Sequence, residues 1–301
     1  MAKSKSQTAL LSQYFRQQIL PTTWCTGCGI GTIMGSIVRA IEATEIAPHR
    51  FVFVTGIGCY GPAGQYIRIS DLHALHGRTP SYATGLKLAN PAVYPILLMG
   101  DGDAASIGGN HLIHAARRNI GVTAIVMNNH NYGMTGGQYS PTTPQQVPAS
   151  TAPYGMVERS FDLCKVVQAA GATFVARTTV YHVSQMVNFL TRAILHKGFS
   201  FVEIESQCPT YFGRFSKRGS PVAMLKWQKE NSVPVEKAGA MKPEELEGKI
   251  VTGIFVEEKR PEYVEDYYRL IGRVKEKLSG YPIFAEDDGY VIFDLTTTDS
   301  R

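Results

Sequence analysis

The sequence lacks any apolar run that approaches the length of a membrane span. A helix needs roughly 20 consecutive apolar residues to cross the core of a bilayer, and no apolar stretch in the 301 residues is that long. The chain begins with the polar run Met-Ala-Lys-Ser-Lys-Ser, whereas a secretory signal requires an apolar segment near the N-terminus. These absences predict a cytoplasmic protein that does not associate with membranes.

Acidic residues are scarce in the first part of the chain. Residues 1–220 contain 9 Asp and Glu against 18 Lys and Arg, while residues 221–301 contain 16 against 12. No glutamate occurs between Glu45 and Glu158. The basic residues are scattered and are not interleaved with aromatic residues, as they are on surfaces that bind nucleic acid. The charge therefore predicts anionic small molecules or an acidic protein as partners, and no nucleic acid.

Cysteines are few, and their positions are informative. Disulfides are not expected in a cytoplasmic chain, so the Cys-x-x-Cys pair Cys25 and Cys28 indicates metal or redox chemistry. Cys59 and Cys208 stand beside Gly or Pro, each after a predicted strand. Cys164 lies in a predicted helix and is expected to be a buried, inert thiol. Four thiolates suit zinc and a [4Fe–4S] cluster alike, so spacing leaves the metal open.

Apolar runs alternate with segments of helical periodicity along most of the chain. This alternation predicts an α/β fold with a mostly parallel sheet and helices on both faces. Ligands of such sheets bind at the carboxyl ends of the strands. The predicted strands are 51–54, 94–99, 122–127, 173–176 and 199–204, and the clearest helices are about 30–43 and 182–195. Residues 72–88 are interpreted as a loop entering a helix, and the proline-containing stretch after Gln138 as a loop.

Two polar motifs follow neighbouring predicted strands. Gly100-Asp101-Gly102 ends one strand, and Asn128-Asn129 ends the next, with 25 residues from Asp103 to Met127 between the motifs. A right-handed crossover places both ends on one edge of the sheet, so Asp101 and Asn129 should meet. Either motif alone would indicate an ordinary turn, but together they resemble the signature of thiamine diphosphate enzymes. In that family, Asp101, Asn129 and the backbone carbonyl of Asn131 would bind Mg²⁺, which prefers oxygen ligands.

The sequence suggests three parts. Residues 1–23 are interpreted as a polar N-terminal arm, and residues 24–220 as the domain that binds thiamine diphosphate and the metal of the four cysteines, which the resemblance described next implies is an iron–sulfur cluster. Residues 221–301, which carry denser charge and an acidic stretch at 286–288, are interpreted as a C-terminal extension that contacts a partner subunit.

Over residues 15 to about 215, the chain resembles the β subunit of 2-oxoacid:ferredoxin oxidoreductases. The resemblance rests on six motifs in family order besides the Gly-Asp-Gly-Asp motif. It favours iron over zinc as the metal of the four cysteines. The motifs are Trp-Cys-x-Gly-Cys-Gly, Gly-Ile-Gly-Cys, Leu-His-Gly-Arg, Ala-Thr-Gly-x-Lys-Leu-x-Asn-Pro, Tyr-Gly-Met-Thr-Gly-Gly-Gln and Cys-Pro-Thr-Tyr.

The resemblance implies the roles of individual residues. Cys25, Cys28, Cys59 and Cys208 would hold one [4Fe–4S] cluster. His76 would act in catalysis, although without the resemblance it would more often be a satisfied loop histidine. The residues that would contact thiamine diphosphate are Ile57, Gly58, Cys59, Tyr60, His76, Gly100, Gly102, Asp103, Met134 and Thr135.

The implied reaction is the oxidative decarboxylation of a 2-oxo acid. Electrons would pass singly through the cluster to ferredoxin, and coenzyme A would capture the acyl group, in a sequence that a strong reductant could reverse to fix CO₂. The motif around Gly136 most resembles 2-oxoglutarate enzymes, with branched-chain 2-oxoacid or pyruvate enzymes as alternatives. Some relatives carry lysine at this position. A non-redox thiamine diphosphate decarboxylase or synthase, or a zinc-stabilised α/β binding module, stays open as another class.

The scarcity of glutamate predicts a partner. Thiamine enzymes need a carboxylate, usually Glu, against the aminopyrimidine ring. Between Glu45 and Glu158 the only acidic residues are Asp71, Asp101 and Asp103, and the last two belong to the diphosphate end. We therefore expect an α subunit to supply the Glu and the pyrimidine-binding domain. Family resemblance implies an (αβ)₂ assembly that is active only with its α subunit.

Overall fold

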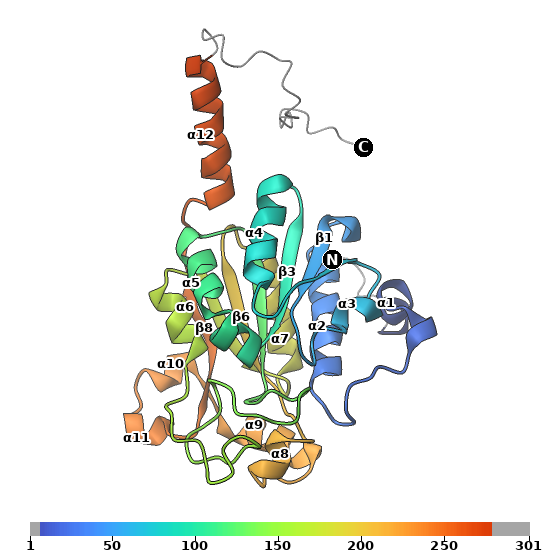
Figure 1. Cartoon of the computed structure of the whole chain (residues 1–301), viewed down its shortest axis with the longest axis vertical. Helices are drawn as coiled ribbons and strands as arrows, with labels where there is room; N and C mark the ends of the chain where they lie inside the picture. Colours follow the sequence, from blue (N-terminus) through green and yellow to red (C-terminus); the bar gives the residue numbers. More distant parts are fainter. Residues whose placement is uncertain (1–6, 279–301) are drawn as a thin grey trace. The chain divides into compact units, whose positions relative to one another are not determined.

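A computed structural model of the chain describes residues 7–278, which contain an eight-stranded sheet (Figure 1). The strands are β1 (Phe51–Thr55), β2 (Ser70–His73), β3 (Tyr94–Gly100), β4 (Thr123–Asn128), β5 (Phe174–Thr179), β6 (Ser200–Glu205), β7 (Ser232–Pro234) and β8 (Ile250–Glu257). Their order is β2-β1-β3-β4-β6-β5-β8-β7. The first six in this order are parallel, whereas β8 pairs antiparallel with β5 and parallel with β7. The predicted α/β fold with a mostly parallel sheet is confirmed.

Helices cover both faces of this sheet. The longer helices are α1 (Gln7–Tyr14), α2 (Ile30–Ala43), α4 (Thr79–Ala89), α5 (Gly109–Arg118), α6 (Leu163–Ala169), α7 (Val183–Leu195), α9 (Pro221–Asn231) and α12 (Tyr263–Leu278). The shorter ones are η1 (Gln17–Ile19), η2 (Pro48–Arg50), α3 (Ala63–Tyr66), η3 (Asp103–Ile107), α8 (Phe212–Phe215), α10 (Val235–Ala238) and α11 (Pro243–Leu246). A second unit begins at Glu265, within α12.

Alternating side chains of the strands build two cores. In β3, Ile96 and Leu98 pack with α2 and α7 on one face, while Leu97 and Met99 pack with α4, α5 and α6 on the other. Successive residues of a strand point to opposite faces, so a central strand must be apolar on both. This explains why the predicted strands are continuous apolar runs.

Local chemistry sets several helix boundaries. The Ser220 side chain accepts a hydrogen bond from the Ala223 amide at the start of α9, and Asp162 accepts one from the Lys165 amide at the start of α6. Such caps satisfy amides that have no partner within the helix. α5 ends at Asn119, whose backbone is left-handed with φ of 53°, a conformation that asparagine tolerates better than most residues.

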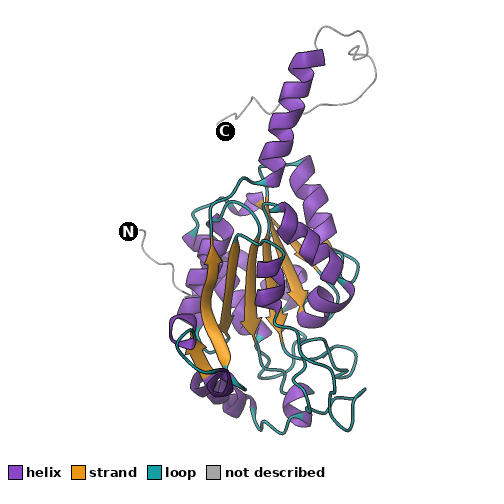
Figure 2. Ribbon diagram, turned by 90° about the vertical axis from the view of Figure 1, so that its left-hand side faces the viewer, coloured by secondary structure: helices purple, strands orange, loops and turns teal. Residues whose placement is uncertain are grey.

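Loops gather at the carboxyl edge of the sheet. Figure 2 shows the loops at the end toward which most of the strand arrows point. These loops follow β1, β3, β4 and β6, the strands after which the sequence places its chemical motifs. The fold therefore brings the motifs together at one edge, as ligand sites of parallel sheets require.

The sheet extends further than the sequence indicated. β2 overlaps the start of the segment interpreted as a loop, and its four residues are all exposed, so it has no apolar pattern. β7 and β8 come from residues interpreted as an extension, and the compact unit reaches Val264. The expected division after residue 220 thus falls inside this unit. The acidic stretch at 286–288 lies outside the described residues.

The expected N-terminal arm packs against the first core. Leu10 and Tyr14 of α1 are buried in the same cluster as Ile33 and Ile37 of α2. The Tyr14 hydroxyl also donates a hydrogen bond to the Glu42 carboxylate at 2.8 Å. From Gln7 onward, this segment is therefore part of the folded body.

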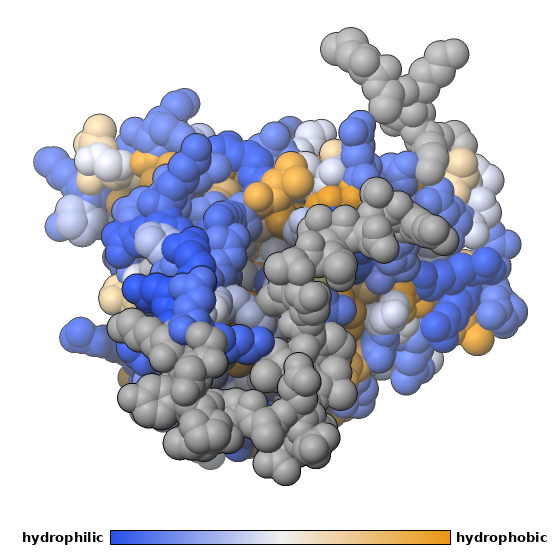
Figure 3. All heavy atoms as spheres, turned by 90° about the horizontal axis from the view of Figure 1, so that it is seen from above, coloured by the Kyte–Doolittle hydropathy of each residue, from blue (hydrophilic) through white to orange (hydrophobic). Residues whose placement is uncertain are grey.

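One face of the molecule is shown in Figure 3. It is mostly hydrophilic, with hydrophobic residues in small separate patches. Among the described residues, no helix has the length and apolar character to cross a bilayer.

Phe201→Ala should destabilise the fold strongly. Phe201 on β6 is fully buried in the second core, and removing a buried phenylalanine ring leaves a cavity that costs about 3–5 kcal/mol of unfolding free energy. Urea unfolding of the purified chain measures the change. Val222→Ala is the control, because Val222 is 60% exposed and its truncation should cost no more than about 0.5 kcal/mol. Equal midpoints for the two variants would contradict this account of the core.

Candidate active site

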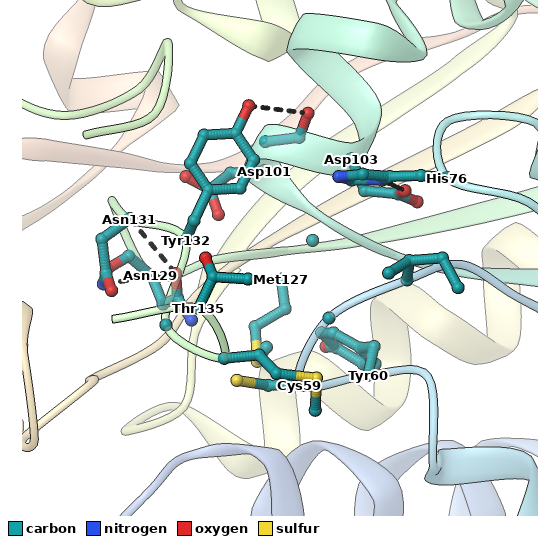
Figure 4. A pocket seen from close by; sticks show the side chains of 16 residues that line it. Cys59, Tyr60, His76, Asp101, Asp103, Met127, Asn129, Asn131, Tyr132 and Thr135 are labelled. Atoms are coloured by element: carbon teal, nitrogen blue, oxygen red, sulfur yellow. Dashed lines mark hydrogen bonds and ion pairs between the residues drawn. The ribbon is translucent and has the colours of Figure 1, made fainter. Parts of the chain in front are cut away.

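A single pocket at the carboxyl edge collects the predicted site residues. About 570 Å³ of space lies within it, including the solvent at its open mouth. Figure 4 shows it from close by. Its lining residues are Ile57, Gly58, Cys59, Tyr60, His76, Gly100, Asp101, Gly102, Asp103, Met127, Asn129, Asn131, Tyr132, Gly133, Met134 and Thr135.

Every residue predicted to contact thiamine diphosphate or Mg²⁺ lines this pocket. Asp101 and Asn129 line the same pocket, as the crossover argument required. Sequence reasoning missed Met127, Tyr132 and Gly133. All three lie in or beside the motif that begins at Asn128, so its immediate neighbours were the available signal.

The loop after residue 138 forms hydrogen bonds with the side chain of Asp101. Asp101 is buried, and its Oδ2 accepts hydrogen bonds from the hydroxyls of Ser140 and Thr142, the latter at 2.6 Å. Burial raises the pKa of Asp101, and these two hydroxyls act against that rise. The hydroxyls therefore favour the ionised carboxylate, the form that binds a metal ion.

Asn128 links the same loop to two buried carboxylates. Its Nδ2 donates to Glu203 at 2.8 Å and to Glu205 at 3.3 Å, which orients the amide. Its Oδ1 then faces Thr142 Oγ1 at 2.9 Å and accepts from the His130 amide at 3.2 Å. The amide thus ties the ends of β4 and β6 to the loop that holds Asp101.

His130 completes this buried network. Its Nε2 lies 2.8 Å from Glu205 Oε2, and its Nδ1 lies 2.9 Å from the Thr142 carbonyl oxygen. Burial lowers the pKa of His130, but the Glu205 carboxylate, together with Asp101 and the Thr142 carbonyl, outweighs burial, and the pKa lies above its ordinary value. Both partners are acceptors, so the protonated ring satisfies both contacts.

Asp103 holds His76 at the opposite wall. Its Oδ1 accepts a hydrogen bond from the Gly77 amide at 2.7 Å and pairs with His76 Nδ1 (Figure 4). Its Oδ2 is buried without a hydrogen-bond partner. A Cβ at Gly56 would lie 2.0 Å from this oxygen, so glycine is required there. Burial raises the pKa of Asp103, and the contacts with His76 and Gly77 oppose that rise.

Four cysteines gather beside the pocket. A Cβ at Gly133 would lie 3.3 Å from Cys59 Sγ and 3.7 Å from Cys208 Sγ, so a larger residue would crowd the first sulfur and touch the second. The Trp24 indole donates to the Cys59 carbonyl at 2.8 Å, which ties the loop of Cys25 and Cys28 to the loop after β1.

The thiols influence one another. Burial raises the pKa of Cys59 to about 12 and that of Cys28 to about 11, and the neighbouring cysteines add to both shifts. Cys25 and Cys208 are among these neighbours. A bound cation displaces thiol protons and neutralises clustered thiolates, so this donor set fits a metal centre.

Cys164 stands apart from this group. It is buried, as expected, and its Sγ lies 3.3 Å from Glu203 Oε2. Burial raises its pKa well above the ordinary value. Asp162, Cys164 and Glu203 have ligand atoms within 4.8 Å of one another. Arg177, however, binds Asp162 at 2.5 Å and Glu203 at 2.8 Å, so these carboxylates are ion-paired.

The pocket contains no glutamate. Among its lining residues, only Asp101 and Asp103 carry carboxylates. Oxygens of both are engaged by the loop hydroxyls or by His76 and Gly77.

The fold and the pocket define a thiamine diphosphate-binding domain. The family described as thiamine pyrophosphate enzyme, C-terminal TPP binding domain, matches residues 55–204. The chain is 49% identical to 2-oxoglutarate synthase subunit KorB of Methanocaldococcus jannaschii, over 88% of this chain and 98% of the relative. It is 37% identical to the 2-oxoacid:ferredoxin oxidoreductase subunit beta of Saccharolobus solfataricus, over 77% of this chain and 75% of the relative.

A solved structure extends this comparison. The 2-oxoglutarate:ferredoxin oxidoreductase of Magnetococcus marinus, with 2-oxoglutarate, coenzyme A and succinyl-CoA bound, superposes with a TM-score of 0.78 at 29% identity, covering 92% of this chain and 93% of that chain. The chain belongs to the family of 2-oxoacid:ferredoxin oxidoreductase β subunits.

Thr142→Val should weaken the binding of thiamine diphosphate. Valine keeps the shape of threonine but removes the hydroxyl that contacts both Asp101 and Asn128. Loss of a group that orients a metal ligand typically costs about 10–100-fold in affinity. Titration of thiamine diphosphate in the presence of Mg²⁺, followed by protein fluorescence, measures the dissociation constant. Thr142→Ser keeps the hydroxyl and is the control. Equal affinities of the two variants would show that the hydroxyl has no such role.

Proposed function

We propose that this chain is the β subunit of a coenzyme A-dependent 2-oxoglutarate:ferredoxin oxidoreductase. It would bind thiamine diphosphate with Mg²⁺ and carry one [4Fe–4S] cluster. The names of the closely similar relatives support the substrate, and coenzyme A and succinyl-CoA are bound in the similar enzyme of known structure. Cytoplasmic location fits these soluble partners.

The observation that carries the proposal is the position of Cys59. This residue lines the cofactor pocket and also belongs to the group of four cysteines. A redox centre held there would lie directly beside the cofactor. That adjacency suits an enzyme that removes electrons from its substrate, and a non-redox decarboxylase has no need of it.

The residues fit the cofactor and its metal ion. Asp101, Asn129 and the Asn131 carbonyl would bind Mg²⁺, since all three residues line the pocket and supply hard oxygen ligands. Thiamine diphosphate, when bound, supplies a carbanion that attacks the 2-oxo acid and a ring that stabilises the charge left by CO₂. His76, fixed through Nδ1 by Asp103, presents its other ring nitrogen for a proton contact in the pocket.

The spacing of the sulfurs supports iron over zinc. With Zn–S bonds of about 2.3 Å, a tetrahedral zinc site brings its four sulfurs within roughly 4 Å of one another. Among the described residues, no three of the four cysteine sulfurs meet a 4.8 Å limit. The irons of a cubane cluster occupy separate corners and therefore suit ligands that are farther apart.

The absence of glutamate among the residues that line the pocket supports an α subunit as the partner of this chain. That subunit would provide the carboxylate against the aminopyrimidine ring, in an (αβ)₂ assembly whose active site lies between the subunits. Within residues 221–301, the part beyond α9 is the proposed region of contact with it. Gly136 stands where some relatives carry lysine, so the substrate contact of that lysine would have to come from elsewhere.

Cys208→Ser should remove or damage the cluster, whereas Cys164→Ser should keep it. The sulfurs of Cys208 and Cys59 both lie near Gly133, whereas the sulfur of Cys164 lies against Glu203. Serine is a poor ligand for iron, so the Cys208 variant should lose most of the iron found in the wild type. Iron analysis and electron paramagnetic resonance of the reduced protein measure the difference. Unchanged iron and spectrum in Cys208→Ser would exclude this residue as a ligand.

The reconstituted chain should be inactive without its α subunit. The test compares the chain alone with the αβ complex, both loaded with Mg²⁺, thiamine diphosphate and cluster, using a panel of 2-oxo acids, coenzyme A and methyl viologen. We expect turnover only in the complex, and fastest with 2-oxoglutarate. Comparable turnover by the chain alone would refute the shared active site. CO₂ release without viologen reduction would favour a non-redox decarboxylase, and preference for pyruvate or a branched-chain acid would correct the substrate.

A further inference from the structure

The four cysteines differ in their exposure to solvent. Cys208 is buried, Cys28 and Cys59 are half-buried, and Cys25 is exposed. Thr26 and Gly27 beside Cys25 are exposed as well. A redox centre held by these thiols would therefore reach solvent on the side of the Cys25–Cys28 loop.

This loop packs against the segment that contains α8 and α9. The Gln207 side chain donates to the Gly27 carbonyl at 2.9 Å, and a Cβ at Gly27 would lie 2.5 Å from Pro221 at the start of α9. The Gly213 amide of α8 donates to the Cys208 carbonyl at 2.8 Å. Figure 1 shows α8 and α9 at the end of the sheet where the loops gather. The two helices thus border the exposed side of the thiol group.

This border is strongly basic. Residues 206–229 contain five Lys or Arg and no Asp or Glu. Arg214, Lys217 and Lys226 are exposed, and within the described residues none of them has a carboxylate partner. The Arg218 guanidinium lies 3.7 Å from the centre of the Trp227 ring and 5.3 Å from that of Phe212, so it packs one helix against the other.

We propose that the surface formed by residues 212–229, the α8–α9 surface, docks an acidic ferredoxin that receives electrons from the cluster. The inference rests on the proposed function and names the face at which its acceptor binds. In each transfer, one electron leaves the reduced cluster and reduces one cluster of the ferredoxin, and no bond forms or breaks. The Cys25–Cys28 loop is the side from which the electron leaves.

Charge and position both favour this partner. Electron transfer requires close approach of the two redox centres. The Cys25–Cys28 loop, which α8 and α9 border, contains the exposed member of the four cysteines. A patch of one sign accelerates the encounter with a partner of the opposite sign and sets the orientation of docking. Salt screens such attraction over about 8–10 Å at ordinary ionic strength, so docking should weaken steeply as salt is added.

The experiment reverses two charges in the loaded αβ complex. The variant Arg214→Glu with Lys226→Glu changes two exposed residues of the α8–α9 surface. The matched control, Arg118→Glu with Lys259→Glu, makes the same change in charge at the opposite edge of the sheet. Arg118 precedes the start of β4, and Lys259 follows the end of β8, which lies beside the start of β5.

Binding of an acidic 2[4Fe–4S] ferredoxin is measured by surface plasmon resonance at several salt concentrations, and its reduction is followed at saturating 2-oxoglutarate and coenzyme A. We expect the α8–α9 variant to bind about tenfold more weakly or worse, with a flatter salt dependence and a higher KM for ferredoxin. The control should match the wild type. Equal weakening in both variants, or in neither, would overturn the docking surface.

An assay with methyl viologen distinguishes a failure of the docking surface from a failure of the proposed function. This small acceptor needs no docking surface, so the α8–α9 variant should reduce it at the wild-type rate. Loss of viologen reduction together with unchanged ferredoxin binding would overturn the role of this surface. Absence of viologen reduction in the wild-type complex would instead count against the proposed function, while the binding comparison would still decide where ferredoxin docks.

Discussion

The buried amide of Asn128 is the interaction on which the cofactor edge depends. Its nitrogen donates hydrogen bonds to the two carboxylates of β6. Its oxygen faces the Thr142 hydroxyl of the loop and accepts a hydrogen bond from the His130 amide. A buried polar group left without a partner costs about 1–3 kcal/mol, so none of these groups can shift alone. The end of β4, the neighbouring strand and the loop that holds Asp101 are therefore fixed as one unit.

This rigid edge places two kinds of chemistry side by side. Asp101 and Asn129 lie on one side of the pocket, while Gly133 continues the same motif to a position against Cys59 and Cys208. Since the motif leaves β4 as a short loop, the oxygens proposed to bind Mg²⁺ lie within a few residues of Gly133, which lies against two of the sulfurs. Their relative position follows from the end of a single strand.

Local patterns in the sequence predicted much of this arrangement. The rest depends on pairing between residues that are far apart in the chain, which the sequence does not reveal. The parallel core strands and every pocket residue named from the motifs could be read from the chain, because apolar runs and glycine-flanked polar residues are local signals. The partners of Asn128 could not, since Glu203 lies 75 residues away. β2 has no apolar side to reveal it, and β8 pairs with β5 and β7, which are partners that local sequence patterns do not indicate.

The two carboxylates of the pocket are already committed to structural contacts. Asp101 receives two hydroxyl hydrogen bonds, which favour its charged form, and Asp103 orients His76 while its second oxygen stays buried. A group that accepts and returns protons during turnover must change its charge without disturbing its neighbours. Neither aspartate is free to do so, because each holds a wall of the pocket through its hydrogen bonds. This agrees with the proposal that an α subunit supplies the carboxylate that handles the proton of the pyrimidine ring.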